Sequence, residues 1–308
     1  MRGLAIALAD GNVHVLDRTK PAPDYFAPLA QIANNHLGTI RTEFGTFSRQ
    51  VSGYAMENLL PENNFDVTRF LVGSEGTLGV VLGADLELVQ SPKHTVLVVL
   101  GYDDMPTAAD AVPALLAHKP IAVEGIDRRI TDVVTARRGE GAVPALPRGA
   151  GWLFVELGAH EEHELIAAAK ALVTDANALD SMIVTDAKQT ATLWRIREDG
   201  AGLSARNARG QSAYAGWEDA AVPVSSLGGY LREFDSLLES FGFTGVPYGH
   251  LGEGCLHIRI DFPLTTIGGE HRTRQFLASA ADLVAAHGGS LSGEHGDGRA
   301  RSELLPRM

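Results

Sequence analysis

The sequence is short of several features that would each mark a class of protein. Its single cysteine, Cys255, excludes a disulfide framework and any iron–sulfur cluster held by the chain's own thiolates. It has no apolar run of transmembrane length, and residues 1–4 lack a signal-peptide pattern. Basic runs are also missing, and the net charge of -12 argues against a nucleic-acid-binding surface. We therefore expect an acidic, soluble, cytoplasmic protein.

The composition is that of a globular protein, with 45% hydrophobic and 21% charged residues. The length of 308 residues is enough for roughly two domains of ordinary size. The composition changes at residues 91–93, where the sequence reads SPK. We place a domain boundary there, between residues 1–92 and residues 93–308.

Hydrophobic patterns predict the elements of the two segments. Before the boundary, a hairpin is expected from two apolar runs at residues 4–8 and 13–16, followed by a helix over 21–36. Apolar runs at 70–72 and 80–88 predict two further strands. Beyond the boundary we expect strands over 95–101, 121–126, 152–157 and 181–184, and helices over 106–118, 127–138, 161–175, 187–207, 227–241 and 273–287. Short strands separated by long helices indicate an α+β layer with the helices on one side of the sheet.

Residues 248–261 contain two histidines in an unusual setting. A glycine-rich turn carries His250 and runs directly into a strand in which Cys255, His257 and Arg259 share one face, because side chains alternate along a strand. The apolar residues between them form the opposite face. Two imidazoles delivered from a turn and a strand can form half of a metal site.

A second polar stretch, residues 293–299, reads GEHGDGR. Its glycines allow a tight approach of the backbone. Glu294 can complete a His, His, Glu set around a divalent, zinc-like ion with one position left open. His295 can then act as a base beside that set.

A third stretch, residues 72–79, reads VGSEGTLG. A turn of small residues exposes backbone N–H groups and hydroxyls, which suits a polar, extended ligand. Three glycines in this stretch let the main chain lie against a flat ring.

Together the stretches at residues 72–79, 249–257 and 292–298 occur in the order that is typical of one family. The sequence resembles the FAD-linked oxidases of the vanillyl-alcohol oxidase superfamily. It is most similar to the branch of glycolate oxidase, D-lactate dehydrogenase and D-2-hydroxyglutarate dehydrogenase, and within it to long fusions that carry a C-terminal iron–sulfur module.

This resemblance implies roles for the residues. Residues 1–92 would be the second half of an FAD-binding domain, and residues 93–308 a substrate-side cap with an antiparallel sheet and helices. The flavin would lie along Gly73, Ser74, Glu75, Gly76, Thr77 and Gly79. A divalent metal would be bound by His250, His257 and Glu294, with His295 as the base and Arg197 holding the substrate carboxylate.

The sequence also departs from the family pattern. Glu253 replaces an aspartate, and Arg259 replaces the asparagine of the 2-hydroxyglutarate branch. Arg259 suggests either a second cationic contact to an acidic substrate or an internal partner for Glu253. Trp217 and Ala201 stand where that branch has a substrate-binding lysine and threonine, so 2-hydroxyglutarate is not assigned.

Length is the largest departure, because family members begin with a glycine-rich segment that cradles the FAD pyrophosphate. The chain starts after that segment and stops before the iron–sulfur module, so we expect a fragment of a longer enzyme. We expect oxidation of a D-2-hydroxy acid to a 2-oxo acid, with the module or a separate chain as electron acceptor. The alternatives are a non-catalytic truncated remnant and, less favoured, a metal-dependent hydrolase that uses His250, His257 and Glu294.

Overall fold

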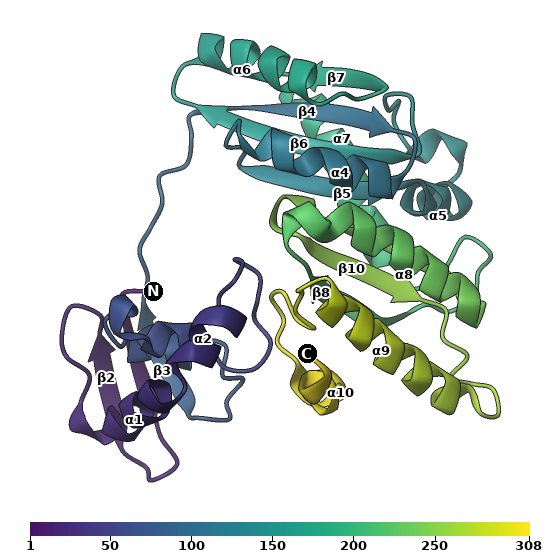
Figure 1. Ribbon diagram of the computed structural model, residues 1–308. Helices are drawn as coiled ribbons and strands as arrows, with labels where there is room; N and C mark the ends of the chain where they lie inside the picture. Colours follow the sequence, from purple (N-terminus) through teal and green to yellow (C-terminus); the bar gives the residue numbers. More distant parts are fainter. The chain divides into compact units, whose positions relative to one another are not determined.

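The computed structural model describes residues 1–308, with the side chains of residues 140 and 201 outside the description. The chain divides into two compact units (Figure 1). Unit 1 comprises Met1–Ser91 and Ser292–Pro306, and unit 2 comprises Pro92–Leu291 and Arg307–Met308. None of the described helices combines the length and the hydropathy that are needed to span a lipid bilayer.

Unit 1 is built on a small antiparallel sheet with the strand order β2-β1-β3. The predicted hairpin is confirmed by β1 (Gly3–Ala7) and β2 (Val13–Asp17), and β1 also pairs with β3 (Val80–Asp85). The α-helices of this unit are α1 (Ala27–Asn35), α2 (Leu37–Glu43), α3 (Val67–Leu71) and α10 (Gly298–Arg301). Ile6, Phe26 and Phe70 belong to the apolar core of this unit, to which α1, α2 and α3 contribute.

Two predictions for unit 1 were wrong. Residues 70–72 were expected to form a strand, but Phe70 and Leu71 lie in α3, whose first turn is capped by Asp66 accepting a hydrogen bond from the Arg69 N–H at 3.0 Å. An apolar run of three residues does not distinguish a helix from a strand. The helix expected over 21–36 begins only at Ala27, because Pro23 holds an extended conformation before it.

Unit 2 is built on a seven-stranded sheet with the order β7-β4-β6-β5-β9-β10-β8, in which every pair of neighbours is antiparallel. The strands are β4 (His94–Tyr102), β5 (Ala122–Asp127), β6 (Gly151–Ala159), β7 (Asp180–Val184), β8 (Tyr214–Ala221), β9 (Gly245–His250) and β10 (Cys255–Ile260). The helices are α4 (Met105–Leu116), α5 (Arg128–Arg138), α6 (Glu162–Asp175), α7 (Ala187–Leu203), α8 (Leu227–Phe241) and α9 (Gly269–Ala286).

Helices cover both faces of this sheet, so the prediction of helices on one side was wrong. On β5, Ile126 packs in a buried cluster with Ile130 of α5 and Leu193 of α7. The neighbouring Gly125 points to the opposite face, where an added Cβ would meet the side chain of Met105 in α4. β4 and β6, two interior strands of the sheet, have buried residues on both faces, and each face therefore needs a cover of its own.

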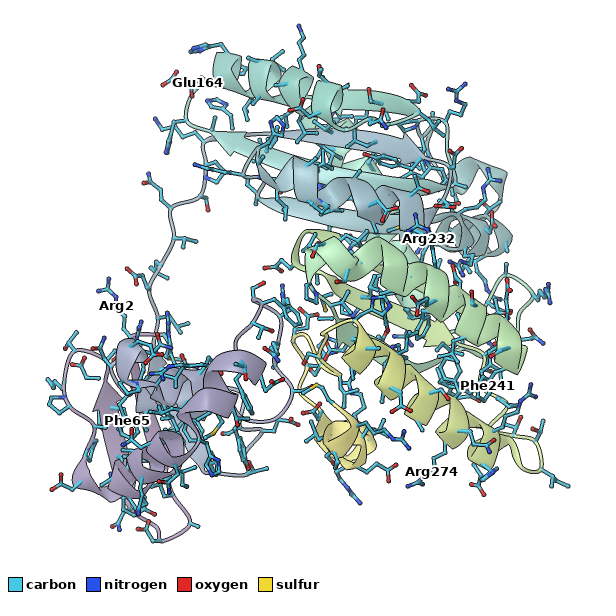
Figure 2. The ribbon with its side chains drawn as sticks, viewed as in Figure 1. Arg2, Phe65, Glu164, Arg232, Phe241 and Arg274 are labelled. Carbon is cyan, nitrogen blue, oxygen red and sulfur yellow. The ribbon has the colours of Figure 1, made fainter. Side chains whose placement is uncertain are left out.

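An aromatic cluster joins the C-terminal half of unit 2. Phe241, at the end of α8 (labelled in Figure 2), contacts Phe243 and Phe276 with ring centroids 5.7 and 5.4 Å apart. Phe276 of α9 is fully buried. These edge and tilted ring contacts fix α8 and α9 over strands β8 to β10.

Strands β8 and β9 were not predicted. Residues 218–223 were interpreted only as the lead into a helix, and residues 245–250 contain two glycines and a proline that hide the strand pattern. The turn after β9 requires a glycine at position 254. Gly254 has φ +75°, and an added Cβ would lie 1.9 Å from the Val222 carbonyl oxygen.

Candidate functional site

One face of the unit 2 sheet brings His250 and His257 together. His257 on β10 lies opposite Tyr248 on β9, and His250 is two residues beyond Tyr248, so all three side chains share a face. The two imidazole rings meet edge to face, with centroids 5.3 Å apart. His257 is 5% exposed.

Both imidazoles are held through Nδ1. The His250 Nδ1 lies 2.5 Å from the Glu124 Oε1, and the His257 Nδ1 lies 2.5 Å from the Glu218 carbonyl oxygen. Because these partners are acceptors, they favour the tautomer that carries a proton on Nδ1. In that tautomer Nε2 has the lone pair that a metal ion requires.

Arg197 reaches the same face from α7. Its Nε donates to the Glu124 Oε2 at 2.8 Å, and its guanidinium lies over the Tyr248 ring at 5.8 Å. The neighbouring Arg195 is exposed, as expected for two residues that do not share a helix face. Arg197 uses Nε for Glu124, so its two Nη groups are the atoms suited to a bidentate carboxylate.

Arg259, two residues beyond His257, forms an ion pair with Glu218 at 3.0 Å. A pair with Glu253 was one of the two roles suggested for Arg259, and the ion pair that the structure shows is with Glu218. The Tyr248 hydroxyl donates to the same carboxylate at 3.2 Å, and burial, with the negative charge of Glu218, raises the pKa of Tyr248. Within the described residues, the buried Nε of Arg259 has no hydrogen-bond partner.

Cys255 lies at the start of β10, beside these groups, and is fully buried. Its Sγ donates to the Asp219 Oδ1 at 3.8 Å, and Asp219 is buried as well. The thiol is thus packed in the interior of unit 2 and is not accessible at the surface.

A cavity of about 310 Å³ opens next to His250 on unit 2. Its lining combines the carboxylates of Glu124 and Glu253 with apolar residues from 116 to 123. Two carboxylates in one lining disfavour an anionic ligand. Arg197, which pairs with Glu124, supplies the positive charge on this face that suits an acid.

Glu294 and His295 belong to unit 1. The Glu294 Oε2 accepts a hydrogen bond from the Arg49 Nη1 at 2.7 Å, and its Oε1 lies 3.2 Å from the His295 Nε2. The His295 side chain is 53% exposed, whereas that of Glu294 is 25% exposed. A carboxylate paired with Arg49 therefore lies beside an accessible imidazole.

The loop that carries Glu294 is anchored within unit 1. The Glu75 carboxylate accepts hydrogen bonds from the backbone N–H groups of Asp297 and Gly298, both at 2.9 Å. Asp297, which is buried, accepts from the Ser52 hydroxyl and the Gly53 N–H, both at 2.8 Å. The stretches at 72–79 and 292–298 are therefore parts of one hydrogen-bonded structure.

The predicted cofactor-binding residues fall into two groups. Gly73 (φ +81°) and Gly76 (φ +74°) are exposed, and nothing described lies within 4 Å of a Cβ added at either. Thr77 is exposed too, with its hydroxyl bonded to Tyr54. The other three hold the loop itself: Ser74 donates to the Leu71 carbonyl oxygen, Glu75 binds the 297–298 amides, and Gly79 packs against Ile6.

The structure thus gathers the predicted residues within each unit. His250, His257, Arg197 and Arg259 share one face of unit 2. Glu294 and His295 lie together in unit 1. That His250, His257 and Glu294 bind one metal ion stays a prediction.

Sequence reasoning missed Glu124 and Glu218, whose carboxylates hold the cations of this face. For Glu124 a signal existed. It is the single charged residue among residues 121–126, in a predicted strand that is otherwise apolar or glycine. A lone carboxylate in such a strand is buried, and a buried charge requires a partner.

Two positions departed from the pattern of the 2-hydroxyglutarate branch. The side chain of residue 201 lies outside the described part of the chain. Trp217 is buried and donates its Nε1–H to the Tyr230 hydroxyl.

The comparison with protein families identifies the chain. The family model described as FAD linked oxidases, C-terminal domain, matches residues 91–308. The chain belongs to this family. The resemblance predicted from the three stretches of sequence and the α+β fold class are thereby confirmed.

Curated relatives within the FAD-linked oxidases are dehydrogenases. A D-2-hydroxyglutarate dehydrogenase of Pseudomonas putida is 30% identical over 291 residues, covering 90% of this chain and 29% of the relative. A D-lactate dehydrogenase of Anaerostipes hadrus is 26% identical, covering 84% of this chain and 54% of the relative. The chain therefore spans less than two thirds of the length of either relative.

Solved structures share the fold. A p-cresol methylhydroxylase with substrate bound has a TM-score of 0.56 at 13% identity, covering 95% of this chain and 57% of that one. A 4-ethylphenol oxidase from Gulosibacter chungangensis has a TM-score of 0.54 at 10% identity, with the same coverage. At these identities the likeness concerns the fold alone.

Proposed function

We propose that this chain provides the substrate and metal-binding part of an FAD-dependent dehydrogenase that oxidises a D-2-hydroxy acid to the 2-oxo acid. The observation that carries the proposal is the shared face on which His250 and His257 meet at 5.3 Å beside the guanidinium of Arg197. Relatives named D-2-hydroxyglutarate dehydrogenase and D-lactate dehydrogenase support the substrate class.

The donor set fits a divalent, zinc-like ion. His250 and His257 would bind it through Nε2, because Nδ1 of each ring is hydrogen-bonded. Glu294 would complete the set. Ser290 is bridged to Ala221 in unit 2, and the four residues that follow Ser290, up to Glu294, span at most roughly 14 Å, so chain length permits this third ligand.

The loop at residues 73–79 fits a flavin. Its exposed backbone at Gly73 and Gly76 leaves open space where any other residue would carry a side chain. Bound FAD would supply the hydride acceptor and the divalent ion a Lewis acid.

The chain's own residues would orient the acid and move its proton. Arg197 would hold the substrate carboxylate through its Nη groups and so aim the α-carbon. Arg259 would add a second positive charge, reduced by its ion pair with Glu218. His295 would accept the hydroxyl proton as general base, a role worth roughly 10²–10⁴-fold in rate.

Electron transfer would continue beyond residues 1–308, because their one cysteine cannot ligate an iron–sulfur cluster. The iron–sulfur acceptor and the cytoplasmic location remain predictions.

The decisive experiment is anaerobic bleaching of the flavin. Protein purified with FAD and Zn²⁺ would be mixed with D-lactate, glycolate and D-2-hydroxyglutarate, and the flavin absorbance followed. We expect one acid to bleach it, His295→Ala to retain the flavin without bleaching, and Arg197→Ala to raise KM at least tenfold. Arg195→Ala, two residues away on an exposed face, is the matched control and should behave as wild type.

Each alternative has its own outcome. A bound flavin that no acid bleaches contradicts the substrate class. Ester hydrolysis that depends on metal, without flavin uptake, supports a hydrolase. Absence of flavin uptake, metal uptake and hydrolysis together supports the non-catalytic remnant.

A further inference from the structure

A buried carboxylate, that of Glu124, lies between two nitrogen groups of different kinds, an imidazole and a guanidinium. Glu124 is 7% exposed. Its Oε1 lies 2.5 Å from the His250 Nδ1, and its Oε2 accepts the Arg197 Nε–H at 2.8 Å. The two oxygens of one side chain thus join a proposed metal ligand to the proposed substrate anchor.

The position of Glu124 in the sheet makes this carboxylate rigid. β5 is an interior strand, in which Glu124 pairs with Phe154 of β6 and the next residue, Gly125, pairs with Gly249 of β9. On the same face Ile126 packs against α5 and α7. A carboxylate fixed by strands on both sides can hold its partners in one geometry.

We propose that Glu124 is a positioning residue for this site. Its Oε1 keeps a proton on Nδ1 of His250 and so directs Nε2 to the metal. Its Oε2 fixes Nε of Arg197 and so orients the two Nη groups to the substrate carboxylate. The inference rests on the proposed function, since it assigns Glu124 to the same metal and the same acid.

The chemistry of the side chain explains why both oxygens are needed. Each accepts a hydrogen bond from a group that is positive or polarised, and such bonds are stronger than neutral ones. Glutamine has one oxygen, so it can accept from His250 or from Arg197 but turns N–H groups towards the other. Loss of a partner that orients a ligating histidine typically weakens metal binding by roughly 10–100-fold.

A buried ion pair with no role in the site would look similar in stability measurements, because breaking it also destabilises the fold. Zn²⁺ affinity, measured together with the histidine tautomer, separates the two cases. The ¹⁵N shifts of the His250 ring report which nitrogen carries the proton, and a pair with only a structural role can set that tautomer without changing the affinity for Zn²⁺.

The test compares Glu124→Gln with Glu124→Asp and Glu156→Gln. Glu156 is a half-buried carboxylate on the adjoining strand β6, opposite Ala122, and serves as the matched control. Zn²⁺ affinity would be measured by titration of the whole chain, and the His250 tautomer by ¹H–¹⁵N NMR. We expect Glu124→Gln to weaken Zn²⁺ binding 10–100-fold and to mix the two tautomers, with Glu156→Gln unchanged in both.

The outcomes distinguish a failure of the positioning role of Glu124 from a failure of the proposed metal-binding function. Equal Zn²⁺ affinity in wild type and Glu124→Gln, whichever tautomer the variant shows, would overturn the role of Glu124 alone. Failure of the wild-type chain to bind Zn²⁺ would overturn the metal centre itself. Should Glu124→Gln lose its circular dichroism, Glu124→Asp decides, because it keeps both oxygens and should retain the tautomer with weakened Zn²⁺ binding.

Discussion

The Glu75 carboxylate accepts the backbone N–H of Asp297 at 2.9 Å, across 222 residues of sequence. It accepts the N–H of Gly298 as well. A residue of the glycine-rich stretch therefore holds the turn that follows Glu294 and His295. The loop at residues 72–79 therefore has a structural role in unit 1 alongside its proposed role towards the flavin.

Glu75→Gln should loosen this turn. Glutamine offers one acceptor oxygen in place of two, and because Glu75 is exposed we expect a loss of about 1 kcal/mol in the free energy of unfolding. Urea denaturation measures it, and proteolysis within residues 292–306 should become faster. Glu43→Gln, an exposed carboxylate of α2 in the same unit, should change neither. Equal effects of the two substitutions would contradict the anchoring role.

Gly254→Ala should destabilise unit 2 strongly. The left-handed φ costs roughly 1–2 kcal/mol for a residue with a side chain, and the clash with the Val222 carbonyl adds to it. We expect a loss of at least about 2 kcal/mol in thermal or urea unfolding. Gly202→Ala, in α7 with open space around it, should be neutral or stabilise by up to about 1 kcal/mol. A stable Gly254→Ala protein would refute the geometry of the turn.

Trp217 and Tyr230 should be energetically coupled. Both are fully buried, and the Trp217 Nε1–H donates to the Tyr230 hydroxyl at 2.8 Å. Trp217→Phe should cost about 2–4 kcal/mol, since it removes ring volume and the hydrogen bond. Together with Tyr230→Phe it forms a double-mutant cycle, for which we expect a coupling energy above about 0.5 kcal/mol. Strict additivity would show that the hydrogen bond contributes nothing.

Glu57 and Glu62 should respond to pH with opposite signs. Burial raises the pKa of Glu57 from 4.5, so the folded state binds this proton more tightly and loses stability as pH rises above 4.5. The hydrogen bond from Arg41 lowers the pKa of Glu62 to about 2, so its stabilisation is present above 4.5 and is lost as pH falls towards 2.

Replacing Glu57 and Glu62 by glutamine, one at a time, tests the two opposite pKa shifts against each other. At neutral pH, Glu57→Gln should raise the unfolding midpoint and Glu62→Gln should lower it. Both differences from wild type should shrink in acid. Urea midpoints measured across this pH range would decide, and a shift of the same sign for both variants would be inconsistent with the two pKa directions.

Sequence patterns predicted the elements whose periodicity is unambiguous. The helix expected over 227–241 is α8 to the residue, because its apolar positions recur at helical spacing and Gly242 ends it in a left-handed conformation. Alternation correctly placed His257 and Arg259 on one face of β10. Patterns failed for β9, whose glycines and proline become a strand only because β5 and β10 pair with it.

Local patterns also predicted one part of the site and missed the part that depends on pairing between distant strands. Histidines and glycine turns have local signatures, so His250 and His257 could be proposed from their spacing. Glu124 acts from a strand more than a hundred residues earlier, and only the pairing of β5 with β9 brings it to His250. Register between distant strands is set by the fold as a whole.

Unit 1 is formed by two segments that lie far apart in the sequence, and this has a consequence for biosynthesis. Its closing segment, Ser292–Pro306, is translated after all of the unit 2 sheet. While the ribosome is producing unit 2, Ser52 and Glu75 still lack the segment that they bind in the finished protein. Unit 2, nearly continuous in sequence, therefore has its whole sheet before unit 1 can form its last hydrogen bonds.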